Sequence, residues 1–399
     1  MPFSTSPEQG FVFAFGLPFI AATILLNITP ILRLLFLKNN MSTLLLSALS
    51  FVLVPLITAL LSPKPIVSMW RAVVFFLGYL FALWMISTSN RKEHLQTMIK
   101  AFFIGGVVLS TYYIVNFIIK GMEVGFDRVI LERYVGGAAS LPWGASGIIS
   151  GVVLLTVVGY FIFGSYVDIK WGWLVPIMCV SAIALTFSRS GVLLSFGAFV
   201  VLALPTLKKS NLYRGVIVVL LTVFVLLLGG QLLERADPDA FEALLLGRLD
   251  DDTVSEAGGR TKIWADRFHD MPSTLFSPHG YYSVGDIYAR RGESSPHNYF
   301  ISTGLEQGIL GIAVGALFWV LLFRALRRSS LSMPRYRWAW FIVLLNLFSD
   351  DLNFAQPYVM AFWSLFALCV AHRRLSVSQH NEFSFQEKTI AVGGQCIVL

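Results

Sequence analysis

The stretch SSPHNYFISTGLEQGILG, Ser294 to Gly311, joins a polar segment to an apolar run of the kind that crosses membranes. Similar apolar runs recur along the chain, in which 56% of the 399 residues are hydrophobic and only 13% are charged. This composition departs from that of soluble proteins. Each span needs about 20 apolar residues. We therefore expect an all-α integral membrane protein.

The hydropathy pattern predicts about eleven transmembrane helices. The apolar runs lie at residues 10–27, 43–61, 66–88, 98–118, 143–163, 171–187, 190–206, 214–232, 298–323, 336–349 and 354–372. The first run has no basic segment or cleavage site, so we expect it to be retained. NITPILRLLFL, Asn27 to Leu37, could add a half-span and make twelve. One transmembrane domain over 1–372 would carry any catalytic residues, and 373–399 would be a disordered cytoplasmic tail.

Lysine and arginine gather in alternate connecting loops, which marks those loops as cytoplasmic. They are Arg33 and Lys38; Arg91 and Lys92; Lys208, Lys209 and Arg214; Arg324, Arg327, Arg328, Arg335 and Arg337; and Arg373 and Arg374. The outer face then carries 119–142, the turn at Arg189, a long segment at 233–297, and the turn at Asp350 and Asp351. The formal charge of +7 follows from the inner loops and indicates topology rather than nucleic-acid binding.

The long outer segment is expected to have structure of its own, because long loops in compact domains usually carry function. DPDAFEALLLGRL predicts an amphipathic helix on the membrane surface, and its residues 240–249 would suit a mobile cover over a site. A second short helix is predicted from Arg260 to about Asp270, ended by Pro272.

Several chemistries lack their motifs in this chain. The histidines of the outer segment match no metal-ligand spacing: His269, His279 and His297. The three cysteines suggest neither a disulfide framework nor a metal site: Cys179, Cys369 and Cys396. Neither a Gly-x-Ser-x-Gly elbow nor a Walker-type phosphate loop occurs. We expect no metal and no cofactor.

Arginines are the remaining candidates on the outer face. Arg189 in TFSRSG stands between two apolar runs, where it could either extend to the interface or bind an anion. Arg260 begins its helix, where a cation does not stabilise the helix dipole. Arg71, Arg128 and Arg133 extend the positive rim. Each alone could be a solvated charge, but together they would suit a diphosphate, whose oxygens match guanidinium groups.

Membranes offer such a ligand as a polyprenyl diphosphate. An enzyme that uses it at the outer face has no nucleotide supply, so the activated bond must already be present in the lipid-linked substrate. Glycosyl transfer from lipid diphosphate to a hydroxyl would fit. That reaction needs a base for the hydroxyl proton, and histidine is the residue type that titrates near neutrality. His297 is the candidate base.

The stretch HNYFISTGLEQGILG resembles the signature of the O-antigen ligase and O-antigen polymerase superfamily, in which a His-Asn pair ends the large periplasmic loop and an apolar helix with Gly-x-x-Gly follows. SRSG before a span and GRTKIW early in the loop belong to the same resemblance, which covers roughly residues 170–320. SLPWGAS, Ser140 to Ser146, departs from the Asn-Pro-Asn element that members often carry, and SPHGYYSVG departs from the usual glycine-rich stretch.

The resemblance implies a metal-independent, inverting glycosyltransferase of the GT-C type in the bacterial inner membrane, with its active site facing the periplasm. On that analogy His297 would be the general base. Arg189 and Arg260 would hold undecaprenyl diphosphate, and Asn298 would orient the loop or the substrate. An O-antigen ligase would use lipid A–core as acceptor, whereas a polymerase would use a second lipid-linked glycan.

A polysaccharide transporter or lipid flippase would also explain many spans. Two features argue against it: the chain has no recognisable internal repeat with paired broken helices, and its polar residues cluster on one face.

Structural roles are expected for several residues near the signature. Four glycines would form a close helix–helix packing surface: Gly304, Gly308, Gly311 and Gly315. Glu306 stands too far from His297 to orient it and should face the bundle interior with Gln307. Asn298 or Ser295 could cap the signature helix. An acidic turn could bind acceptor hydroxyls or pair with arginines of the loop: Asp350, Asp351 and Asn353 with Arg290 and Arg291.

Overall fold

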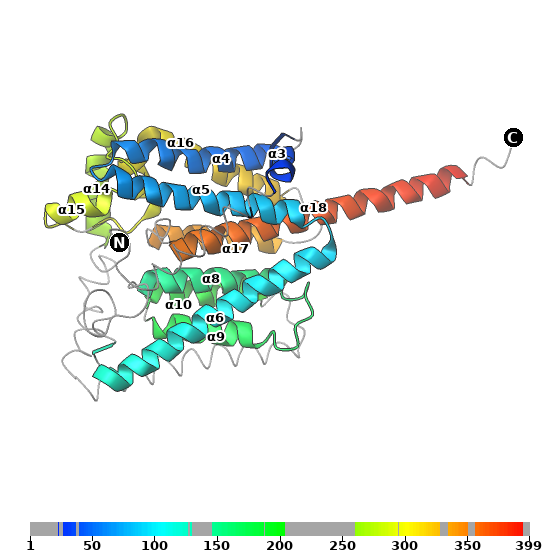
Figure 1. The fold of residues 1–399 in the computed structure, drawn as a ribbon, viewed down its shortest axis with the longest axis horizontal. Helices are drawn as coiled ribbons and strands as arrows, with labels where there is room; N and C mark the ends of the chain where they lie inside the picture. The colour runs from blue at the N-terminus through cyan, green and yellow to red at the C-terminus, as the bar shows by residue number, and fades with distance from the viewer. Residues whose placement is uncertain are drawn as a thin grey trace.

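The computed structural model describes Thr23 and residues 27–36, 40–126, 128–129, 146–186, 188–203, 260–293, 295–327, 334–349 and 356–393. This part of the chain is helical and contains no strand, as expected for an all-α integral membrane protein (Figure 1). The elements are α3 (Ile28–Phe36), α4 (Asn40–Thr58), η2 (Ala59–Leu61), α5 (Pro65–Thr88), α6 (Lys92–Val124), α8 (Ser146–Phe163), α9 (Leu174–Leu185), α10 (Arg189–Ala198), η3 (Phe199–Ala203), α14 (Arg260–Thr274), α15 (Val284–Arg290), α16 (Tyr299–Arg327), α17 (Pro334–Ser349) and α18 (Gln356–Gly393).

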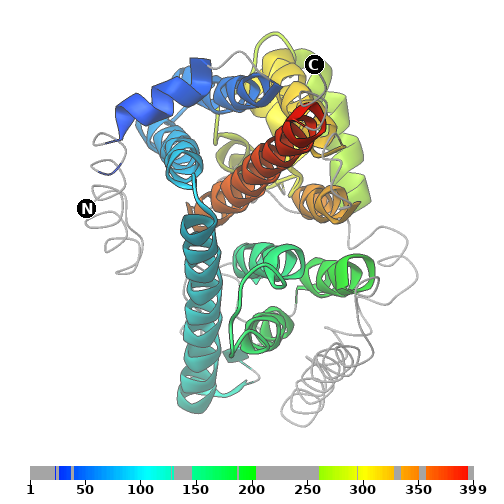
Figure 2. The same ribbon diagram turned by 90° about the vertical axis from the view of Figure 1, so that its right-hand side faces the viewer.

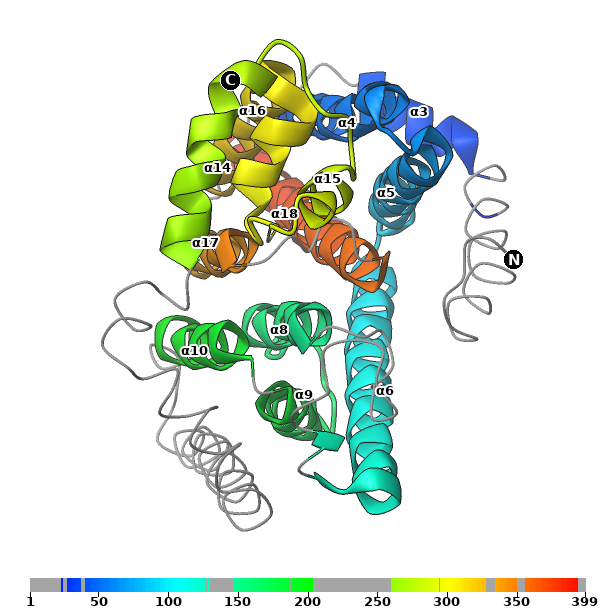
Figure 3. The same ribbon diagram turned by 90° about the vertical axis from the view of Figure 1, so that its left-hand side faces the viewer.

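The helices form two groups that share a seam. One group contains α4, α5, α16 and α18, and the other contains α6, α8, α9 and α10 (Figures 2 and 3). Helices α17 and α18 pack against α8 and so join the groups. The short helices α14 and α15 lie together at one end of the bundle, beside the start of α16 (Figures 1 and 3).

Four helices of the described residues are long and apolar enough to cross a membrane: Met41–Leu61, Pro65–Thr88, Lys92–Val124 and Tyr299–Leu326. Shorter apolar helices occupy four more predicted spans: Ile148–Phe163, Leu174–Leu185, Ser190–Leu202 and Tyr336–Phe348. The predicted run 354–372 falls in α18, while 10–27 and 214–232 lie outside the described residues. The half-span at Asn27 to Leu37 contains α3, whose nine residues rise only about 14 Å, too little to cross.

The two ends of the bundle differ in composition. At one end Phe163, Tyr336 and His372 meet, and the Tyr336 hydroxyl lies 2.8 Å from His372 Nδ1. Basic residues predicted to face the cytoplasm lie there too: Lys92 Nζ is 5.8 Å from the ring of Tyr166, which itself packs on His372. We call this the basic end.

At the opposite end, which we call the outer end, α16 begins and α17 finishes. Asn298 Nδ2 donates to the carbonyl of Phe348 over 3.1 Å, which fixes the two termini side by side. The segments that carry the predicted site residues therefore lie at the end remote from the basic residues.

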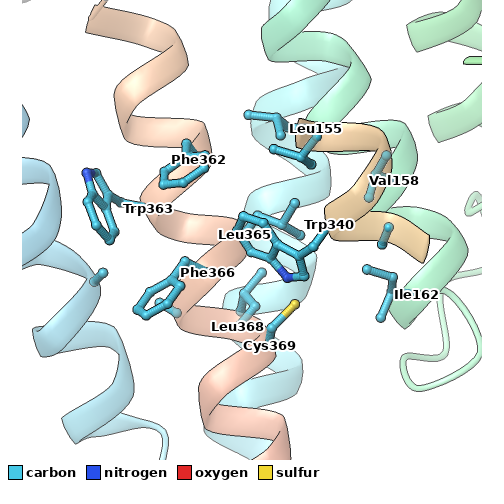
Figure 4. Packing of buried hydrophobic residues seen from close by; sticks show 14 of the residues in the cluster. Leu155, Val158, Ile162, Trp340, Phe362, Trp363, Leu365, Phe366, Leu368 and Cys369 are labelled. Atoms are coloured by element: carbon cyan, nitrogen blue, oxygen red, sulfur yellow. The ribbon is translucent and has the colours of Figure 1, made fainter. Parts of the chain in front are cut away.

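Aromatic rings fill the middle of the bundle. Phe51 of α4 stacks on Phe318 of α16 with a centroid separation of 4.7 Å, and Phe75 of α5 lies 5.7 Å from Trp363 of α18. Along the seam, α18 and α17 pack on α8, with Trp340 among the buried side chains (Figure 4). With so little polar surface inside, close packing rather than hydrogen bonding holds this region.

Two predicted helix ends are wrong. Helix α14 continues through Pro272 to Thr274, because a proline in the last turn removes one backbone hydrogen bond without ending the helix at once. The tail predicted as disordered is helical up to Gly393, because α18 runs on past Arg373 and extends beyond the bundle (Figure 1).

Candidate functional site

The SRSG motif is a capped turn between α9 and α10 at the outer end. Ser188 is the N-cap of α10 and its hydroxyl accepts from the amide of Gly191 over 3.2 Å. Gly191 packs so closely on Ser150 of α8 that an added Cβ would lie 2.8 Å from the Ser150 Cβ. Arg189 is the first residue of α10, and its side chain lies outside the described part of the structure.

The GRTKIW motif begins α14, with Arg260 as its first residue. The side chain of Arg260 is not among those described. Four residues later, Trp264 donates from Nε1 to the carbonyl of Pro296 over 2.7 Å. This hydrogen bond joins the two motifs that were quoted separately from the sequence, and it fixes the residue that precedes His297.

His297 lies in the irregular segment just before α16, and its backbone conformation is unusual for a non-glycine residue. Its φ is +45°, in the left-handed region, and its side chain is exposed. On its other side Asn298 is 2% exposed and caps α16, because its Oδ1 accepts from the amides of Phe300 and Ile301. Of the two predicted caps, Asn298 is therefore the one used. Both the nitrogen and the oxygen of its side-chain amide are hydrogen-bonded to backbone groups.

A charged cluster holds the segment before His297 on α14. Arg267 is 6% exposed and donates to Asp270 over 3.0 Å and to Glu293 over 2.7 Å. Its guanidinium lies 3.7 Å from the ring centroid of Tyr288, whose hydroxyl donates to Asp270 over 2.8 Å. We call these four residues the Arg267 cluster. Trp264 and Arg267, three residues apart on α14, thus anchor residues 288–296 at two points.

Burial and hydrogen bonding act against each other on the ionisable groups of this cluster. Burial lowers the pKa of Arg267, but the hydrogen bonds to Asp270 and Glu293 outweigh that effect and leave the pKa raised. Burial raises the pKa of Asp270, and the bonds from Tyr288 and Arg267 bring it below its usual range. Burial, together with the hydrogen bond to Asp270, raises the pKa of Tyr288 to about 12. The cluster is therefore ionised as an ion pair over the neutral range.

Helix α16 is broken inside the signature. Gly308 has φ +64° and ψ −154°, a conformation that is essentially restricted to glycine. An added Cβ there would lie 2.4 Å from the carbonyl oxygen of Leu275, which accepts from the amide of Ile309. Gly308 thus packs closely on the backbone at the end of α14, as predicted, and it also breaks α16, which the prediction did not include. Gly304 packs closely too, because its Cβ position is 2.8 Å from Met271 of α14.

The other two glycines of the signature are not tight interhelical contacts. The Cβ position of Gly311 faces Thr303 and Gln307 of its own helix, and that of Gly315 makes only ordinary contacts at 3.8 Å. The predicted packing surface is therefore limited to Gly304 and Gly308.

Glu306 faces the bundle interior, as predicted, and is 1% exposed. Its Oε1 accepts from the amides of Ser283 and Val284 over 2.9 and 3.0 Å, so the carboxylate caps the start of α15. Two backbone hydrogen bonds connect the same segments: the amides of His279 and Gly280 donate to the carbonyls of Leu305 and Glu306. The loop that precedes α15 is thereby fastened along the broken part of α16.

The same loop contacts Arg71. The guanidinium of Arg71 lies 5.0 Å from the ring centroid of Tyr282, and Tyr282 has φ +58°. Tyr282 and His297 are the two non-glycine residues with positive φ in the described chain. Such conformations cost of order 1–3 kcal/mol each and concentrate at functional sites.

Other predicted residues are not brought to this place. Arg128 is exposed and follows the end of α6. Helices α8 and α9 lie between that end and helices α14 and α16 (Figure 3). Residues outside the described chain include Arg133, the predicted helix at 237–249, and the acidic turn with Asp350 and Asp351. Within the described residues, no three His, Cys, Asp or Glu side chains are grouped as metal ligands.

Sequence reasoning missed the roles of Trp264, Arg267 and Tyr282. Trp264 is part of the quoted GRTKIW motif, so the residue itself was singled out. Its hydrogen-bond partner, the carbonyl of Pro296, could not be predicted from the sequence. Arg267 and Glu293 are 26 residues apart, and no spacing rule connects them.

A family model described as O-antigen ligase matches residues 174–316, a range that begins at α9 and ends within α16. Residues 174–316 are thus similar to the O-antigen ligase family, which supports the resemblance seen in the sequence motifs. No curated protein and no solved structure matched the chain. The O-antigen ligase match indicates a glycosyl-transfer enzyme acting on lipid-linked glycans and lipid acceptors, and the apolar helices make it a multi-pass membrane protein.

Within this O-antigen ligase segment, the three quoted motifs occupy one end of the bundle. Arg189 begins α10, whose Gly191 contacts Ser150, and α10 packs on α17, whose Phe348 carbonyl accepts from Asn298. Trp264 of α14 bonds the residue before His297. Arg189, Arg260 and His297 therefore belong to backbone segments at the same, outer end.

Proposed function

We propose that this protein is a metal-independent, inverting glycosyltransferase of the O-antigen ligase type. It would transfer a glycan from undecaprenyl diphosphate to a hydroxyl of lipid A–core at the periplasmic face of the bacterial inner membrane. The observation that carries the proposal is the hydrogen bond from Trp264 to Pro296, because it joins the helix that Arg260 begins to the turn that presents His297.

The chemistry assigns one role to each kind of group. His297 removes the proton from the acceptor hydroxyl while that oxygen attacks the anomeric carbon of the donor. The bond from this carbon to the diphosphate breaks with inversion, and undecaprenyl diphosphate leaves with both electrons of that bond. Arg189 and Arg260 neutralise the charge that grows on the leaving group. Arg71 would add to the positive rim, whereas Arg128 lies away from it and Arg133 stays a prediction outside the described residues.

An exposed His297 between two anchored neighbours supports this assignment. A base must reach its substrate and must be held in position, and Pro296 and Asn298 are both fixed by hydrogen bonds while the imidazole stays accessible. Asn298 is buried in the cap of α16, so its contribution is to orient the turn that presents His297.

The proposal is tested with purified protein reconstituted with lipid-linked glycan and lipid A–core in the presence of a chelator. The wild-type protein should form product, and His297→Ala should lower the transfer rate about 10²- to 10⁴-fold, the usual contribution of general base catalysis. His269→Ala is the matched control, because His269 is an exposed histidine on α14 and no role is proposed for it. Equal activity of His297→Ala and wild type would refute the proposal.

The same assay separates the alternatives by product. An O-antigen polymerase would lengthen a second lipid-linked glycan and leave lipid A–core unmodified. A flippase would move the lipid between leaflets without forming any glycosidic bond. The O-antigen ligase match supports both ligase and polymerase, and the ligase assignment rests on the single dominant outer segment of the chain.

A further inference from the structure

Helix α14 has a covered side and an uncovered side. Arg267 and Thr274 are buried and lie seven residues apart, so the side that they share faces the protein. Phe268 and Pro272 lie four residues apart on another side, and both are exposed. Phe268 is 56% exposed, and Phe276, two residues after the helix end, is 87% exposed. Two aromatic rings are therefore left uncovered at the outer end.

The exposed residues of α14 change in character along the helix. In its first half they include the charged residues Lys262 and Asp266. Beyond Asp266, the exposed residues up to Ser277 include no lysine, arginine, aspartate or glutamate. The polar start and the aromatic end are typical of a segment that enters a membrane surface at an angle, with its end deepest.

The end of α14 lies against the point where α16 becomes exposed. The carbonyl of Leu275 accepts from the amide of Ile309 over 2.9 Å. All residues from 301 to 308 are buried, whereas Ile309 and Leu310 are 48% and 47% exposed. Helix α16 is long and apolar enough to cross a membrane, so its exposed apolar side chains face lipid. Two more of them follow along the helix: Leu317 and Val320.

The position of α14 in the bundle directs its uncovered side outward. Viewed along the bundle axis, α14 lies at the edge between α16 and α17, whereas α15 lies nearer to the centre, over α18 (Figure 3). The view from the opposite end also places α14 at the edge (Figure 2). Because Phe276 directly follows Leu275, its ring stands beside the first lipid-facing residues of α16.

We propose that the uncovered side of α14 inserts into the outer leaflet of the membrane, with Phe276 among the acyl chains of the phospholipids and Phe268 nearer to their headgroups. The partner is lipid, because this surface continues the lipid-facing side of α16. Removing an aromatic ring from water favours the insertion. The proposal does not rest on the proposed function, because it requires only a bilayer around α16.

Insertion would fix the depth of the segment that carries the signature. Helix α14 begins at Arg260, and its Trp264 bonds the carbonyl of Pro296, the residue before His297. A membrane anchor at the end of α14 would therefore hold this turn at a constant distance from the bilayer. Phe268 and Phe276 would act as positioning residues that touch neither substrate.

Spin labelling of the full-length protein tests the insertion in nanodiscs of phosphatidylethanolamine and phosphatidylglycerol. A nitroxide is attached in turn at Phe276→Cys, at Phe268→Cys and at Lys262→Cys, which is the matched control on the same helix. Cys396→Ser is the background, and the native thiols of Cys179 and Cys369 are buried and should not react.

Oxygen dissolves preferentially in acyl chains, whereas a nickel chelate stays in water. The ratio of the collision rate with oxygen to that with the chelate should be severalfold higher at residue 276 than at residue 262. Residue 268 should give an intermediate ratio. This gradient would report the angle at which the segment enters the leaflet.

A second variant tests whether Phe276 anchors the helix. Phe276→Asp places a carboxylate among the acyl chains, which is costly, so the end of α14 should move toward water. The label at Phe268→Cys should then collide more often with the chelate. Lys262→Asp is the matched control and should leave that label unchanged, because Lys262 is expected to lie in water already.

Two results would overturn the proposal. If the chelate reaches residue 276 as readily as residue 262, the uncovered side lies in water. If neither oxygen nor the chelate reaches residue 276, protein covers it, either as a second copy or as another segment of the chain. The proposed function is tested separately, because retained transfer in His297→Ala would refute it and leave the collision rates unchanged.

Discussion

The middle of the bundle and its outer end are built by different forces. In the middle, rings such as Phe51, Phe318 and Trp363 fill space against one another with few directional bonds. At the outer end, the Arg267 cluster, the Glu306 cap and the Trp264 bond each fix a backbone segment in one direction. The middle therefore determines whether the protein folds, and the outer end determines where its reactive groups stand.

The largest expected effect is in the middle. Trp363→Ala should destabilise the protein by about 3–5 kcal/mol, because it removes a large buried side chain that six neighbouring rings surround. Thermal unfolding in detergent measures the loss. Trp338→Ala, at a 48% exposed tryptophan of α17, should change stability far less. Equal midpoints for the two variants would remove the distinction between the regions.

Gly308→Ala should come next, with a loss of about 3 kcal/mol from the strain of a disfavoured backbone conformation and the collision with the Leu275 carbonyl. Stability and activity should both fall, because the break at Gly308 sets the direction of the first part of α16, which begins at Tyr299. Gly315→Ala is the control, because its Cβ would meet only ordinary contacts. A fully stable, active Gly308→Ala would mean that the break is not required.

Arg267→Met tests whether the Arg267 cluster mainly positions residues 288–296 or mainly stabilises the fold. The buried guanidinium is lost, but Asp270 and Glu293 are partly exposed and remain hydrated, so the stability cost should be about 1–2 kcal/mol. Transfer activity should fall more than stability, because residues 288–296 lose one of their two anchors on α14. Kinetics and thermal unfolding on the same preparation test this. Lys262→Met, at an exposed lysine of α14, should affect neither.

The smallest effect is expected for Tyr288→Phe, about 0.5–1.5 kcal/mol for one hydrogen bond to Asp270. The pKa of Tyr288 in the folded protein is about 12, above the ordinary value of 10.0, so the folded state holds this proton more tightly than the unfolded chain. The contribution is complete below pH 10 and declines as the pH rises toward 12. Ultraviolet titrations of the wild type and of Tyr288→Phe should differ by one phenolate, which forms near pH 12 in the wild type.

Much of the fold was predictable because a membrane span has a simple sequence signal. The apolar runs at 43–61, 66–88, 98–118 and 298–323 coincide with long helices. Helix ends were less predictable, as Pro272 and the region after Arg373 demonstrate. In both places the chain continues a helix that single-residue rules would stop, because those rules weigh local preference and ignore the cooperative extension of an existing helix.

The site was predictable only in outline. Three quoted motifs meet at one end, as a shared site requires, yet the bonds that fix them connect residues far apart in sequence. Glu306 reaches amides 22 and 23 residues away, and no periodicity encodes such a pair. The glycines of the signature were ambiguous for another reason. Gly304 and Gly308 belong to one regularly spaced series, but Gly304 lies within regular helix against Met271, whereas Gly308 breaks the helix.

Helix α9 has a consequence for how a lipid substrate would be handled. Its 12 residues rise about 18 Å, well short of the roughly 30 Å of hydrocarbon. Gly191, two residues after Arg189, packs on Ser150 of α8 and on Ile183 of α9. Under the proposed function, a donor phosphate bound at the start of α10 would be reached while its chain still lies in the leaflet. Binding there would avoid extracting a long isoprenoid into water, which would cost about 0.8 kcal/mol for every methylene exposed.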